Sequence, residues 1–92
     1  MATGPIGRKI IEKLNQAFRP EALDLEDESD LHAGHMGHNP KGESHFRVTI
    51  VSDAFEGKRP IERHRMVNRV LSDELRDRVH ALAIVARVPG EE

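Results

Sequence analysis

The stretch Phe55-Glu56-Gly57-Lys58-Arg59-Pro60-Ile61-Glu62-Arg63-His64-Arg65-Met66-Val67 decides the fold, together with its continuation to Leu82. Pro60 suits the first position of a helix, where the N–H that proline lacks would have no partner. Apolar residues then recur at helical spacing: Val67, Val70, Leu71 and Leu75. The pattern predicts one helix from Pro60 to about residue 78, followed by a nearly unbroken apolar strand over residues 79–88.

The chain upstream supplies another helix and two strands. Ile6, Ile10, Leu14 and Phe18 recur every four residues, which predicts a helix over residues 4–18, widened by Ile11 and Ala17. Alternating apolar and polar residues predict strands over 22–28 and 44–52. Ser52-Asp53 offers a cap for a short helical turn around residues 54–56. Residues 30–43 contain three glycines and a proline, which is typical of a loop.

The order helix-strand-strand-helix-strand predicts an α+β fold, a two-layer sandwich whose helices cover one face of a three-stranded mixed sheet. The first two strands are expected to be antiparallel. The second and third are joined by a crossover helix, so they are expected to be parallel.

Length and composition indicate one domain over residues 1–92, with a small core. The sequence has no cysteine, no apolar leader segment and no run long enough for a membrane span. We therefore expect a soluble cytoplasmic protein without membrane contact. Three phenylalanines are its only aromatic residues, which disfavours a base-stacking platform for single-stranded nucleic acid.

Charge is unevenly distributed along the chain. Residues 21–44 carry seven acidic and one basic side chain, whereas residues 55–78 carry seven basic and five acidic ones. The plain interpretation is a mixed solvated surface. The sharper one is a basic face that meets an acidic partner or phosphates. The candidate nucleic-acid contacts are Lys58, Arg59, Arg63, Arg65 and Arg69.

Six histidines are the unusual chemical resource of this chain. His32, His35 and His38 are spaced by two residues within the loop, and imidazole is the commonest metal ligand. The alternative is a polar loop whose histidines contact water. His64 is expected on the buried side of its helix as a hydrogen-bonded structural residue, while His80 stands at the entry of the last strand, within reach of the surface.

An enzyme is not expected from this sequence. There is no cysteine nucleophile, and the sequence holds no Gly-x-Ser-x-Gly elbow, P-loop or dinucleotide fingerprint.

Several segments together resemble the BolA family, over about residues 6–90. They are Glu43-Ser44-His45-Phe46, Phe55-x-Gly57-Lys58, Arg63-His64-Arg65-Met66-Val67, Glu74-Leu75 and Val79-His80-Ala81-Leu82. The BolA fold is similar to the class II KH fold, so the resemblance implies the same α+β architecture as the residue pattern.

The resemblance also implies a partner and a metal cluster. BolA-like proteins pair with monothiol glutaredoxins, which supply thiolates together with glutathione, and they share a [2Fe-2S] cluster with them. It implies His80 as one ligand and a loop residue as the second. Counting from Asp27-Glu28-Ser29 favours His32, whereas counting back from Ser44-His45-Phe46 leaves His35 or His38.

A chain without cysteine cannot make an all-thiolate site, so the free protein is expected to hold no cluster. We also expect the free protein to be a monomer or weak homodimer. Imidazole ligation of one iron is known from Rieske-type centres. The alternative function is a KH-like, nucleic-acid-binding transcriptional regulator, with weak DNA binding through the basic residues.

Overall fold

The computed structural model describes residues 4–28, 45–77, 79 and 81–91. Its elements follow one another along the chain as α1 (Pro5–Phe18), β1 (Ala22–Asp27), β2 (His45–Val51), the short 3₁₀ helix η2 (Asp53–Phe55), α2 (Pro60–Val70), α3 (Ser72–Asp77) and β3 (Ala81–Arg87). Among these residues we find no helix with the length and apolarity needed to span a bilayer.

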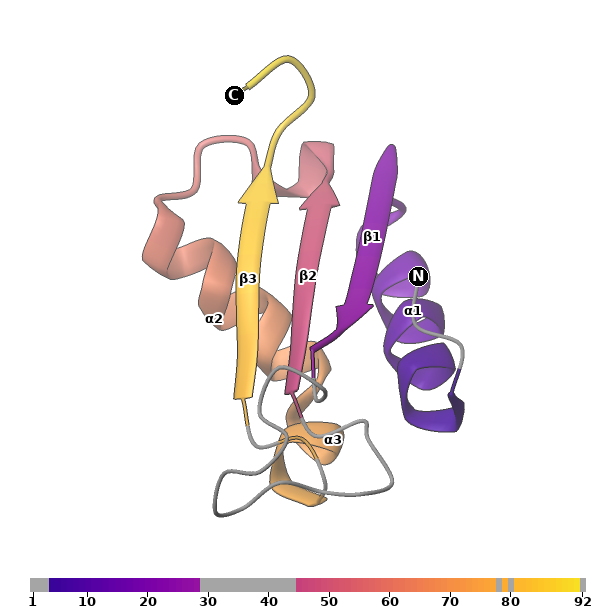
Figure 1. The fold of residues 1–92 in the computed structure, drawn as a ribbon. Coiled ribbons are helices and arrows are strands. Elements are labelled where there is room, and N and C mark those ends of the chain that lie inside the picture. The colour runs from indigo at the N-terminus through magenta and orange to yellow at the C-terminus, as the bar shows by residue number, and fades with distance from the viewer. Residues whose placement is uncertain (1–3, 29–44, 78, 80, 92) are drawn as a thin grey trace.

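The sheet has the order β1-β2-β3, with β1 antiparallel and β3 parallel to β2. In Figure 1, α2 crosses behind the sheet, α1 lies beside β1 at the right, and α3 lies below the lower ends of β2 and β3. The predicted α+β two-layer fold with a mixed three-stranded sheet is therefore confirmed. The strand boundaries agree with the sequence to within about two residues, as expected when side-chain alternation marks a strand.

Helix α1 begins and ends as its sequence predicts. Gly4 precedes it in an extended conformation and Pro5 occupies its first turn. Arg19 ends it in the left-handed region at φ 44°, where its N–H donates to the carbonyl of Asn15 at 3.0 Å. Ala17 is a correction to the predicted apolar stripe, because it is exposed, and the buried positions recur every three or four residues: Gly7, Ile10, Leu14 and Phe18.

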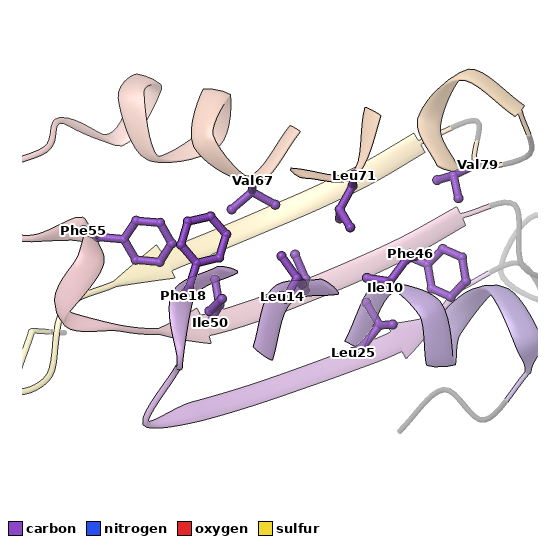
Figure 2. Close-up of a cluster of buried hydrophobic side chains, with 11 residues drawn as sticks. Ile10, Leu14, Phe18, Leu25, Phe46, Ile50, Phe55, Val67, Leu71 and Val79 are labelled. Carbon is purple, nitrogen blue, oxygen red and sulfur yellow. The ribbon is translucent and has the colours of Figure 1, made fainter. Parts of the chain in front are cut away.

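The core lies between α1, α2 and the helix-facing side of β2 (Figure 2). The β2 side chains on this face, Phe46, Val48 and Ile50, are at most 2% exposed. Phe18 and Phe55 pack with ring centroids 5.1 Å apart. Ser52 caps η2, as predicted, and its buried hydroxyl also donates to the carbonyl of Phe18 at 2.6 Å. This bond joins the end of α1 to the end of β2.

The single helix predicted from Pro60 to about residue 78 is instead two helices. At Leu71 the backbone leaves helical geometry, with φ −100° and ψ 18°, and the Leu71 side chain enters the core. Ser72, Asp73 and Glu74 are residue types favoured at a helix start, so they stabilise a new helix after the break. The change of direction allows Glu74 of α3 to pair with Lys13 of α1 at 2.8 Å.

The predicted buried position of His64 is wrong, because His64 is exposed and Arg63 is buried. The helix is rotated so that Arg63, Val67 and Leu71 face the core. Sequence rules place arginine at the surface, and they fail here because the Arg63 guanidinium has hydrogen-bond partners on three other segments of the chain, described below.

The two flanks of the core differ in coverage. Beneath α1 and β2 the side chains are fully buried, whereas the side chains between α2 and β3 are only half-buried: Met66, Val70, Leu82 and Ile84. We call these four residues the open flank. Strand β3 is the sheet's edge, so no further described strand covers them.

Candidate functional site

One end of the sheet gathers the residues next to the predicted cluster ligands. In the antiparallel ladder Asp27 pairs with Phe46, and in the parallel ladder His45 pairs with Ala81. The N–H of Glu28 also donates to the carbonyl of His45 at 2.7 Å. The chain therefore leaves β1, enters β2 and enters β3 at the same sheet end.

The predicted ligands His32, His35, His38 and His80 lie outside the described residues. Their assignment stays a prediction. Their described neighbours are placed: Glu28 and His45 bound residues 29–44, while Val79 and Ala81 bound residue 80. Val79 is buried and its N–H donates to the carbonyl of Glu74 at 2.9 Å, so the chain before residue 80 is anchored to α3. Within the described part of the chain, no group of three or more His, Asp or Glu could hold a metal ion.

A second surface lies along α2. Lys58, Arg65 and Arg69 line a hollow of ≈ 220 Å³ with Met66 and Glu62. Three cations and one carboxylate make this hollow basic on a chain whose net charge is −2. It can attract an acidic or phosphorylated ligand by long-range electrostatics. We call these five residues the basic hollow.

Glu62 has a structural partner at the start of α2. Its carboxylate accepts hydrogen bonds from the backbone N–H of Arg59 at 2.9 Å and from the Arg59 Nε at 3.4 Å. The backbone bond, followed by the Arg59 side chain, lowers the pKa of Glu62. Glu62 and Arg59 thus partly neutralise each other, and the positive charge of the hollow rests on the other three cations.

Arg63 has a different role from the other predicted phosphate contacts. Its Nε donates to the carbonyl of Lys58 at 2.9 Å, and its Nη1 donates to the carbonyl of Ala86 at 3.0 Å. Both terminal nitrogens bind the carboxylate of Glu91. With its side chain 11% exposed, Arg63 joins α2, β3 and the C-terminal turn. Its predicted role as a nucleic-acid contact is therefore corrected to a structural one.

Arg63 lowers the pKa of Glu91 by this hydrogen bonding, and Glu91 in turn raises the pKa of the guanidinium. Sequence reasoning missed both Glu91, which follows the last predicted strand, and Met66, which lines the hollow. The spacing of Glu62, Arg65 and Arg69 in steps of three and four residues is the signal that places them on one face of α2, and Lys58 lies just before that helix.

The protein is thus a small two-layer α+β domain with two candidate binding surfaces. Comparison with known proteins identifies its family. The family model described as BolA-like protein matches residues 14–91. The chain belongs to the BolA family, as its motifs predict.

Individual relatives agree. The chain is 49% identical over 90 residues to BolA-like protein 1 of Mus musculus, covering 98% of this chain and 63% of that protein. It is 51% identical over 76 residues to a protein of Vibrio cholerae named DNA-binding transcriptional regulator BolA, covering 82% of this chain and 67% of that one. The solved BolA domain of SufE1 from Arabidopsis thaliana superposes with a TM-score of 0.87 at 48% identity, covering 96% of each chain. This chain thus spans less than two thirds of the mouse protein's length.

Proposed function

We propose that this protein is an adaptor that binds a monothiol glutaredoxin and helps to hold a [2Fe-2S] cluster in iron–sulfur cluster trafficking or iron regulation. Membership of the BolA family supports this role. The observation that carries it is the register of the sheet: His45 pairs with Ala81, and Glu28 bonds to His45, so the chain bounding both predicted ligand segments meets at one end.

The donor chemistry fits a shared cluster. With no cysteine in the sequence, the chain offers imidazole, and the thiolates must come from the partner and its glutathione. His80 would hold one position, and His32, His35 or His38 a second. The described flanks would serve as the rigid support that a metal ligand requires, because Val79 is buried against α3 and Ala81 belongs to the ladder.

Co-expression with a monothiol glutaredoxin tests this proposal. We expect the two proteins to co-purify as a coloured complex whose visible spectrum differs from that of the glutaredoxin purified alone, because imidazole replaces thiolate at one iron. Failure to form a complex, or a complex whose spectrum matches that of the glutaredoxin alone, would contradict the proposal.

A second candidate function is DNA binding, which the basic hollow and the name of the Vibrio relative favour. The contacts would be Lys58, Arg59, Arg65 and Arg69, without Arg63. Because these contacts would be cations that bind phosphates, binding to a labelled duplex should be weak and should fall steeply with salt. Tight, sequence-selective binding that survives high salt would make DNA the leading function.

A further inference from the structure

The outer edge of β3 carries unpaired backbone groups, and this edge is the starting point of the inference. Arg87 accepts a hydrogen bond from the N–H of Ser52, so its polar groups point toward β2. In a parallel ladder alternate residues point the same way. The N–H and C=O groups of Leu82, Ile84 and Ala86 therefore point away from the sheet. Among the described residues, the Ala86 carbonyl has a partner there, Arg63, and no described strand pairs with the rest.

Arg63 closes this edge at one end only. Its guanidinium binds the Ala86 carbonyl and Glu91 together. This arrangement gives the Ala86 carbonyl, near the carboxyl end of β3, a hydrogen-bond donor. An added strand therefore cannot extend past residue 86. At Leu82 and Ile84 the edge is left available, and β3 there is apolar, with no charged residue between Ala81 and Ala86. An uncovered apolar edge of this kind is a template for strand addition.

The surface beside the edge favours one kind of strand. Helix α2 begins beyond the outer edge of β3 and crosses behind the sheet in Figure 1. The open flank supplies apolar, half-buried side chains from α2 and β3. On α2, Met66 belongs both to this flank and to the basic hollow, so apolar surface passes directly into the cluster of Lys58, Arg65 and Arg69.

We propose that the β3 edge and the basic hollow together form a docking groove for an extended acidic segment of a partner protein. The segment adds to β3 as a fourth strand through the backbone groups of Leu82 and Ile84. Its apolar side chains cover the open flank, and its carboxylates face the three cations. A protein strand fits better than nucleic acid because the groove offers a row of backbone donors and acceptors with apolar flanking surface, and the described residues beside it carry no aromatic side chain for base stacking. The groove does not depend on the cluster site, so it stands or falls apart from the proposed function.

A peptide titration tests the backbone part of the proposal. The probe is a fluorescein-labelled peptide of about eight residues, in which threonine occupies every second position and valine and glutamate take turns at the positions between. Its valines and glutamates then share the face toward α2, because alternate strand residues point the same way. Binding is followed by anisotropy and by amide chemical shifts. We expect the largest amide shifts at Leu82, Ile84 and the basic hollow. Two further peptides, N-methylated on every threonine or on every valine and glutamate, each block one edge of the strand. One should lose about tenfold or more in affinity while the other keeps it. Equal binding by both would overturn strand addition.

Variants test the two surfaces with matched controls. Arg65→Glu should weaken the peptide about tenfold, while Arg8→Glu, an exposed arginine on α1, should leave affinity unchanged. Ile84→Pro removes one outward N–H, a change that edge strands tolerate, and it should lower peptide affinity further. If the Ile84→Pro variant unfolds, the two N-methylated peptides still test strand addition on the wild-type domain. The same peptide with lysine in place of every glutamate that binds equally well, or a labelled DNA duplex that binds the groove more tightly at the same salt, would overturn the proposal.

Discussion

The two flanks of the core differ in how completely their side chains are buried. Beneath α1, the side chains of Leu14, Phe46 and Ile50 are at most 2% exposed. Between α2 and β3, Met66 and Ile84 are half-buried and end at an uncovered sheet edge. Because burial of apolar surface is the main favourable term in folding, the first flank should carry the stability, while the second has apolar surface left for a partner.

The test with the largest expected effect replaces one leucine by alanine on each flank. Leu14→Ala removes a fully buried side chain and should cost about 2–5 kcal/mol of unfolding free energy. Leu82→Ala, at a half-buried position of β3, should cost about 1 kcal/mol because less apolar surface is lost. Urea denaturation measures both. Equal losses would show that the flanks do not differ as described.

A second test concerns the guanidinium that closes the carboxyl end of β3. Arg63→Met keeps much of the side-chain volume but leaves the Lys58 and Ala86 carbonyls without this donor. We expect a lower midpoint of thermal unfolding, because polar groups at a partly buried site lose their partner. Arg65→Met, on the exposed side of the same helix, is the matched control and should unfold close to the wild-type temperature. An unchanged midpoint for Arg63→Met would show that the hydrogen bonds of Arg63 do not stabilise the fold.

A smaller effect is expected from pH. Arg63 lowers the pKa of Glu91 below its ordinary value of 4.5. The stability that this pair contributes is therefore complete above 4.5 and is lost as the pH falls through the lowered pKa. Glu91→Gln should be less stable than wild type at neutral pH, and the gap should close in acid.

Denaturation curves measured at about pH 7 and about pH 3 check this effect. Glu12→Gln, on the exposed face of α1, serves as the control and should follow the wild type at both values. A gap that stays constant or widens in acid would contradict the pairing of Glu91 with Arg63.

Much of the fold was predictable because it follows from short-range patterns. Alternation of apolar and polar residues marked β1 and β2, and a four-residue period marked α1, in which Ile10, Leu14 and Phe18 are buried. The break at Leu71 was harder to predict, because the apolar spacing continues through it. It depends on a tertiary choice: Leu71 enters the core, and Glu74 reaches Lys13 on a helix distant in sequence.

The candidate sites divide in the same way. Arg65 and Arg69 were predictable as one basic face of α2, because a four-residue spacing is local information, and Lys58 lies just before that helix. Arg63 sits within the same run of charges, and only its contacts with Ala86 and Glu91 distinguish it from its neighbours. The edge position of β3 follows from the predicted strand pairing, whereas the hydrogen bond from Arg63 that closes the carboxyl end of this edge is a tertiary contact.

The most direct test of the central claim compares two histidines in the co-purified glutaredoxin complex. His80→Ala is expected to alter the visible spectrum or to shorten cluster retention, while the free domain keeps its fold. The matched control is His64→Ala, on the exposed side of α2, which should leave the spectrum, the retention and the stability unchanged. A His80→Ala complex whose spectrum and retention equal those of the wild type would contradict the role of this domain as a cluster-sharing adaptor through His80.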